Sequence, residues 1–297
     1  MRIFLSALIL FTIFILPKEA SAGAWTVPKG GWYLELYNKY YWHNSQFNAD
    51  GDKTRWGYGG RYTEWMSELK AEYGITDKFN LLASIPYKHA IWSDHFNHDV
   101  SSDVGDSWVK AKYRFFDETT MPFVFSGQAG LRIHGPYDPH DSPALGYHEM
   151  AGEARLIASK SFSILPSYGG VEVAYRPRGK KPANEIPYFL EYGYYPTNWA
   201  MFKGTLDGVK AIRGTGIKED YTKWTASIIL SLRGTFGTFR KKDLEEEAME
   251  EAEIGWPAVL WWLKKYIREI ELGYGNTFIG KNASAGSEIF FKATNQF

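Results

Sequence analysis

Apolar and polar side chains alternate along residues 61–88, in two stretches joined by a short turn at 74–78. One face of the first stretch carries Trp65 and Leu69, and the other carries mainly acids and a lysine. A side-chain period of two on both sides of a tight turn predicts an antiparallel hairpin. Each arm has about eleven residues, whereas soluble strands centre on about five or six and tilted membrane-spanning strands need about 9 to 11. The pattern therefore predicts a transmembrane β-barrel.

The same alternation predicts about twelve strands in an all-β, antiparallel, up-and-down barrel. The other ten expected strands are 32–42, 105–115, 123–133, 150–159, 170–176, 186–195, 199–207, 223–236, 267–274 and 286–297. Short connections such as 116–122 alternate with long ones such as 89–104 and 135–149. Because such barrels have short periplasmic turns and longer extracellular loops, the long connections are expected outside the cell and both termini in the periplasm.

The first and last residues fit export to a bacterial outer membrane. Residues 1–22 combine a basic start, an apolar run at 3–16 and small residues up to Ala22, which is typical of a secretory signal peptide. The apolar run is shorter than the ~20 residues that a spanning helix needs. The mature barrel is expected to comprise 23–297. The terminal Phe297, on the lipid-facing side of the last strand, resembles an assembly signal, so outer-membrane lipids and the assembly machinery are expected partners.

Residues 240–266 break the alternation of short and long connections. They fall where a short periplasmic turn is expected, yet 243–253 carries seven acids with alanine and methionine between them. This composition predicts a short helix in an acidic periplasmic insertion. A solvated insertion and a docking surface for a periplasmic partner at 243–253 both remain open.

Composition narrows the function classes. The chain has 34 basic and 34 acidic residues, which gives no indication of nucleic acid binding. It has no cysteine, which excludes disulfides, zinc–thiolate sites and cysteine nucleophiles. Aromatic residues make up 17% of the chain, and barrels place such residues in girdles at the membrane interfaces.

Several segments resemble one family of outer-membrane proteins. They are GAWTVPKG at 23–30, AEYGITDKFNLLASIPY at 71–87, GDSWVKAKYRFF at 105–116, NEIPYFLEYGYYPTN at 184–198 and NTFIGKNASAGS at 276–287. The sequence resembles the MetA-pathway of phenol degradation family (phenol meta-pathway) of outer-membrane β-barrel transporters. The resemblance implies an outer-membrane location and transport of small, including aromatic, molecules. It brings no catalytic residues, and the insertion at 240–266 departs from the family pattern.

The inward face of the expected barrel carries charges of both signs. The residues expected to line the lumen are Glu64, Glu68, Glu72, Lys110, Lys112, Arg114, Arg132, Glu172 and Arg176. A wall mixed in this way is not that of a strongly anion- or cation-selective pore, which lines up charges of one sign. The three cations at 110, 112 and 114 either pair with the three glutamates at 64, 68 and 72 or guide anions.

All seven histidines fall in or beside the expected extracellular loops, near several aspartates. Clusters of histidine and carboxylate can bind zinc or copper. A candidate metal site therefore comprises His95, His98, His134 and His140. The alternative is that loops simply collect polar residues.

Enzymatic activity is the rival class, because some barrels of this size are lipases with His and Ser two positions apart on one strand. His43 and Ser45 have this spacing, but no third, orienting group is identifiable. The interpretation is therefore a non-enzymatic, porin-like channel for passive passage of small solutes, aromatic or organic ones included, without a cofactor. The alternative is a plugged barrel that acts as a receptor or scaffold.

Overall fold

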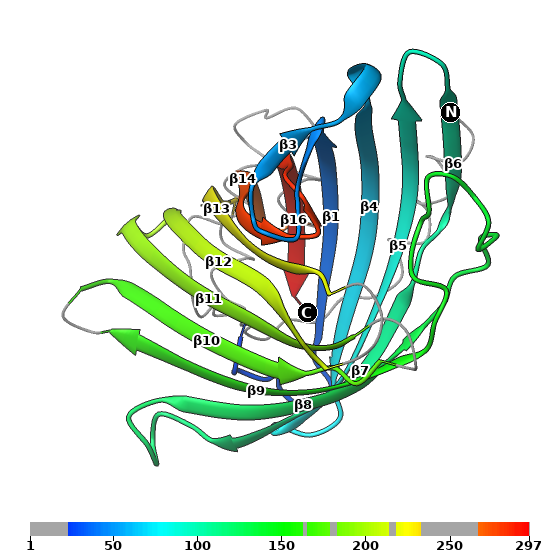
Figure 1. Cartoon of the computed structure of the whole chain (residues 1–297). Coiled ribbons are helices and arrows are strands. Elements are labelled where there is room, and N and C mark those ends of the chain that lie inside the picture. The colour runs from blue at the N-terminus through cyan, green and yellow to red at the C-terminus, as the bar shows by residue number, and fades with distance from the viewer. Residues whose placement is uncertain (1–22, 163–164, 179–182, 214–217, 233–266, 297) are drawn as a thin grey trace, which may run out of the picture.

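The computed structural model describes residues 23–162, 165–178, 183–213, 218–232 and 267–296 (Figure 1). Twelve described strands pair in chain order, each antiparallel to the next, and β1 closes the ring by pairing with both β4 and β16. They are β1 (Trp32–His43), β4 (Arg61–Gly74), β5 (Phe79–Ser93), β7 (Ser107–Phe116), β8 (Val124–Ile133), β9 (Ala151–Phe162), β10 (Ser167–Tyr175), β11 (Asn184–Thr197), β12 (Ala200–Arg213), β13 (Asp220–Ser231), β14 (Glu269–Lys281) and β16 (Ser287–Gln296). The predicted all-β barrel of about twelve strands is confirmed.

The barrel turns its apolar face outward. On β4 and β5, Leu69 is 46% exposed and Ile85 is 52% exposed, whereas Glu64 and Glu72 are each 7% exposed. A soluble protein would bury the leucine and expose the acids. A closed ring of paired strands leaves no free backbone edge, as a spanning structure in lipid requires. This is the fold and the surface of a bacterial outer-membrane β-barrel.

The loop expected at 89–104 is largely strand. β5 continues to Ser93, and β6 (His98–Val104) pairs with this upper half, while β7 pairs with the lower half. The hairpin of β5 and β6 rises above its neighbours in Figure 1. The prediction of a loop was wrong because it placed the end of the strand where the alternation of apolar and polar residues stops. A strand beyond the bilayer needs no apolar face, so the alternation can stop while the backbone pairing continues.

The two ends of the barrel differ, and we name them the long-loop end and the short-turn end. The long-loop end carries the connections β1–β4, β5–β7, β8–β9, β10–β11, β12–β13 and β14–β16. Three short strands form a small separate sheet at this end. A 3-10 turn, η1 (Gly57–Gly59), follows the second of them in the chain. The three strands are β2 (Ser45–Phe47), β3 (Lys53–Arg55) and β15 (Ala283–Ser284).

Three predictions fall outside the described residues. The signal peptide at 1–22, the helical insertion at 240–266 and the assembly signal at Phe297 all lie there, so each stays a prediction. Among the described residues, no helix is long and apolar enough to cross a membrane.

Candidate functional site

The charged side chains inside the barrel are extensively paired. Because successive side chains of a strand point to opposite faces, the acids and lysines opposite the exposed apolar residues meet inside the ring. The described ion pairs include Lys70–Glu35 at 2.9 Å, Lys39–Glu64 at 3.1 Å, Lys70–Glu68 at 3.4 Å, Lys112–Glu72 at 2.7 Å, Lys203–Glu271 at 2.8 Å and Lys223–Glu288 at 2.9 Å. Much of the interior charge is therefore neutralised locally.

The three cations of β7 find different partners. Lys112 reaches across β5 to Glu72, as one of the two interpretations expected. Lys110 instead turns to Glu153 on β9, at 3.1 Å, and Arg114 donates to the main-chain oxygen of Asp77 at 3.1 Å. The expected pairing with the glutamates of β4 thus holds at one position of three. Lys112 and Lys110 each reach across one intervening strand, but in opposite directions, and the order of the strands alone does not say which direction a long side chain takes.

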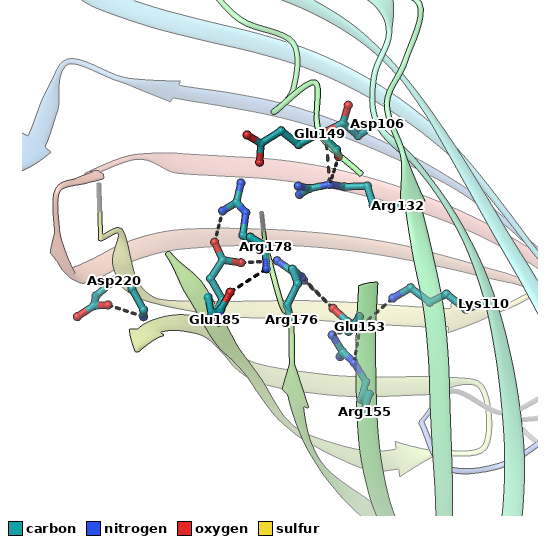
Figure 2. A network of polar contacts seen from close by, with 12 residues as sticks. Asp106, Lys110, Arg132, Glu149, Glu153, Arg155, Arg176, Arg178, Glu185 and Asp220 are labelled. Carbon is teal, nitrogen blue, oxygen red and sulfur yellow. Dashed lines mark hydrogen bonds and ion pairs between the residues drawn. The ribbon is translucent and has the colours of Figure 1, made fainter. Parts of the chain in front are cut away.

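Glu153 is the centre of a second network, on β9. Its carboxylate contacts Lys110 at 3.1 Å, Arg155 at 3.0 Å and Arg176 at 2.7 Å, and its side chain is 1% exposed (Figure 2). Arg155 also pairs with Glu172. The network thus joins three residues predicted to line the lumen, Lys110 of β7, Glu172 of β10 and Arg176 just after β10, with Glu153 of β9 at its centre.

Residues 134–150, which we call the inner loop, fold against the inner wall at the long-loop end. Tyr137 is 2% exposed, Leu145 is 0% exposed, and both pack against Ala90 of β5. Ala90 lies two residues after Lys88, so the two side chains are on the same face of β5. Lys88 pairs with Glu64, so this face points into the barrel. The loop therefore occupies part of the barrel mouth.

Asp106 fastens the inner loop. Its carboxylate accepts hydrogen bonds from the Tyr137 hydroxyl at 2.6 Å, the Tyr147 main-chain N–H at 3.0 Å and the Gly135 N–H at 3.4 Å. Arg132 lies 3.6 Å from it. Burial, together with the bond to Asp106, raises the pKa of Tyr137 to about 12, so the phenol stays a donor at physiological pH. The sequence interpretation missed this clamp.

The segment 23–31 lies inside the short-turn end, and we call it the N-terminal segment. The Ala24 N–H donates to Ser159 Oγ at 3.2 Å, and Thr26 Oγ1 donates to the main-chain oxygen of Asp77 at 2.7 Å. Ala24 and Val27 are each 0% exposed. The segment thus spans from β9 to the β4–β5 turn, which gives the GAWTVPKG stretch a structural role that its sequence did not reveal.

A cavity of about 870 Å³ lies beside the N-terminal segment. Aromatic rings line it together with charges of both signs, among them Trp25, Tyr33, Tyr168, Glu191 and Lys203. Trp25 packs edge-on against Tyr168, with ring centres 6.2 Å apart. The cavity is large enough for a small organic molecule by comparison with typical ligand pockets.

Aromatic rings also lie inside the barrel, among the ion pairs. On β1, Tyr37 lies on the same inward face as Glu35 and Lys39. Its ring centre is 5.2 Å from Lys70 Nζ and 5.3 Å from Lys292 Nζ. These are cation–π distances. The sequence interpretation assigned aromatics to the membrane girdles, although the shared parity with Glu35 already indicated an inward ring.

The predicted metal residues do not form one cluster in the described loops. The His134 and His148 rings lie tilted against each other with centres 4.5 Å apart, whereas the His95 ring lies against Phe96 at 5.2 Å. In the described part of the chain, no three His, Asp or Glu side chains are arranged to hold a metal ion. Metal binding at His95, His98, His134 and His140 stays a prediction.

His43 and Ser45 lack the contact that a nucleophile and its base require. His43 Nδ1 lies 3.2 Å from the main-chain oxygen of Ser45, and Ser45 Oγ donates to Asn44 Oδ1 at 2.9 Å. The His43 ring packs against Trp56, with centres 4.5 Å apart. The arrangement provides no activated serine.

Comparison with known proteins places the fold. No family model matches the chain, and no curated protein matches its sequence. Among solved structures, the chain is similar to the COG4313 outer membrane channel from Pseudomonas putida F1, with TM-score 0.64 and 13% identity over 94% of this chain and 100% of that one. Weaker likenesses include the NalP autotransporter translocator domain from Neisseria meningitidis, with TM-score 0.43, 8% identity and coverage of 100% and 94%. Another is the CymD monoaromatic hydrocarbon channel, with TM-score 0.38, 9% identity and coverage of 90% and 88%. The chain thus shares its overall fold with the first of these structures.

Proposed function

We propose that the protein is a passive channel that carries small organic solutes, aromatic ones included, across the outer membrane. The observation that carries the proposal is the 870 Å³ cavity inside a closed barrel, lined by aromatic rings and paired charges. Rings such as Trp25 and Tyr168 offer apolar contact to a solute, and the surrounding ion pairs keep the wall wettable. A solved protein with the same fold is an outer membrane channel, which agrees with this class.

In this proposal the long-loop end faces outward and the short-turn end faces the periplasm, as in other barrels with this loop pattern. The inner loop then stands at the entrance and the N-terminal segment at the exit. Neither belongs to the ring of paired strands, so each can move without opening the barrel. The predicted lumen-lining residues would form the wall between them.

Conductance in planar bilayers tests the proposal. Purified protein should give discrete current steps, and liposomes that contain it should take up small aromatic solutes faster than protein-free liposomes. Heat-unfolded protein is the control. Absence of both current steps and uptake, with a barrel that is folded on gels, would refute the proposal.

A plugged barrel that serves as a receptor or scaffold is the second candidate. The dense pairing of buried charges favours it, because Glu153 alone joins three cations across the interior. A permanently filled interior would give no current at any voltage, even after removal of the inner loop. A channel should instead respond to that removal with larger current steps.

A further inference from the structure

Two arginines at the long-loop end lie against one tyrosine ring. Arg132 belongs to β8, Arg178 follows β10, and Tyr147 belongs to the inner loop. The guanidinium carbons lie 4.7 Å (Arg132) and 3.9 Å (Arg178) from the Tyr147 ring centre. Arg132 is 4% exposed and Arg178 is 7% exposed, while Tyr147 is 50% exposed. Two buried cations thus meet at a ring that remains open on one side.

The two guanidinium groups have more N–H donors than their neighbours offer acceptors. Arg178 Nη1 donates to Glu185, but Arg178 Nε and Nη2 have no hydrogen-bond partner although both are buried. Arg132 Nε donates to the main-chain oxygen of Glu149 at 3.4 Å, while Arg132 Nη2 is buried without a partner. An unsatisfied buried donor costs about 1–3 kcal/mol, and more when it is charged. The structure therefore places three nitrogen donors where an acceptor is missing.

The neighbouring acids are already engaged. Glu185 is shared by Arg178 and Arg176, and Asp106 is occupied by the inner loop. Arg176 is further held by Glu153 (Figure 2). These acids cannot serve the free donors without giving up existing contacts.

Two further acids lie nearby and could compete for the arginines. Glu149 lies beside Arg132, and its Oε2 is itself buried without a partner. Burial, with the charge of Glu185, raises the pKa of Glu219, which weakens Glu219 as an anionic partner, although Arg178 acts in the opposite direction. Glu149 is therefore the internal carboxylate best placed to substitute for an external one.

We propose that Arg132 and Arg178 form a binding subsite for the carboxylate group of a small organic anion, beside the Tyr147 ring. A carboxylate has two oxygens in one plane, which match the planar fork of guanidinium donors. The half-exposed Tyr147 offers an adjoining surface for an aromatic or aliphatic body. The inference rests on the proposed function, because it names a chemical class of solute and the place where it is recognised.

Calorimetric titration of the folded full chain in detergent tests the subsite, with benzoate as the probe and benzyl alcohol as the uncharged comparison. Benzoate should bind more tightly than benzyl alcohol. Arg132→Gln and Arg178→Gln should each weaken benzoate binding by about tenfold or more, since each removes one side of the fork. Arg55→Gln, which removes an exposed arginine of β3 at the same end, should leave it unchanged.

Two smaller substitutions keep the test informative if an arginine-to-glutamine variant does not fold. Arg178→Lys keeps the charge but loses the fork, so it should bind benzoate more weakly than the unaltered protein. Glu149→Gln removes the competing carboxylate, so it should bind benzoate more tightly. Folding of every variant is checked by heat-modifiable migration on gels.

Benzoate affinity that is the same in all arginine variants would overturn the subsite. Phosphate that binds as tightly as benzoate would also overturn it, because the site would then be a general oxyanion site. Binding is measured without conduction, so a barrel that binds benzoate but passes no current fails only the proposed function. A conducting barrel that ignores benzoate fails only the subsite.

Discussion

Removal of the Asp106 carboxylate should release the inner loop from the barrel wall. In Asp106→Ala, the Tyr137 hydroxyl and the Tyr147 N–H lose the acceptor that they reach at 2.6 Å and 3.0 Å. Hydrogen bonds to a charged group contribute about 1.5–3 kcal/mol each. Even at the lower value, two bonds give about 3 kcal/mol, which corresponds to roughly a hundredfold change in the ratio of closed to open loop.

The chain has no cysteine, so a single introduced thiol reports on the loop. Leu145 is 0% exposed, and a thiol in Leu145→Cys should react slowly with a maleimide while the loop is closed. Adding Asp106→Ala should accelerate the reaction by up to about a hundredfold, if opening precedes reaction. Tyr137→Phe removes the hydroxyl that donates to Asp106 and accepts from the His148 N–H, but keeps the Tyr147 N–H bond to Asp106, so it should give an intermediate rate.

Two controls make the result specific. A thiol in Asp141→Cys, at an exposed position of the same loop, should react fast with or without Asp106→Ala. Asp99→Ala removes an acid from β6 and should leave the rate at Leu145→Cys unchanged. A rate at Leu145→Cys that changes less than about threefold in Asp106→Ala would refute the clamp.

Three other changes test the structure elsewhere. In Gly74→Ala, the new Cβ would lie 2.0 Å from the Pro28 main-chain oxygen, so the N-terminal segment should shift and the temperature of barrel unfolding on gels should fall. An unchanged temperature would contradict this packing. Lys112→Met leaves the Glu72 carboxylate buried without its cation, which should cost roughly 3–5 kcal/mol in urea unfolding, and Glu72→Gln in the same chain should recover much of it. No recovery in the double variant would show that the pair is not the cause. Thiols in Asn48→Cys and Glu247→Cys should differ on intact cells, with the first labelled by an impermeant maleimide and the second not. Equal labelling would refute the predicted orientation.

The strands could be predicted from the sequence because lipid imposes a local rule. A spanning strand must place apolar side chains on one face, and Leu69 opposite Glu64 and Glu68 already shows it. The same reasoning failed at β6, where lipid no longer imposes the rule. It also did not give Lys110 its partner Glu153 on β9, because the alternation says which side chains point inward but not which of them meet.

The inner loop and the N-terminal segment could not be predicted, because their contacts join residues far apart in the chain. Asp106 and Tyr147 are separated by all of β7, all of β8 and most of the inner loop, and no periodic pattern connects them. Gly105 and Asp106 interrupt the strand pairing with β5, because they lie between β6 and β7. An acid at such an interruption is free to bond with something other than a neighbouring strand.

The pairing of the interior charges limits where a solute can be recognised. A lysine such as Lys112, which is held at 2.7 Å by a buried glutamate, presents little net field to a passing molecule. Recognition then falls to groups that the protein itself leaves unsatisfied. In the described interior these include the free donors of Arg132 and Arg178, and rings that line the cavity, such as Trp25, add apolar contact. A barrel with nearly balanced charge can therefore still distinguish solutes, because the distinction depends on unpaired hydrogen-bond donors rather than on net charge.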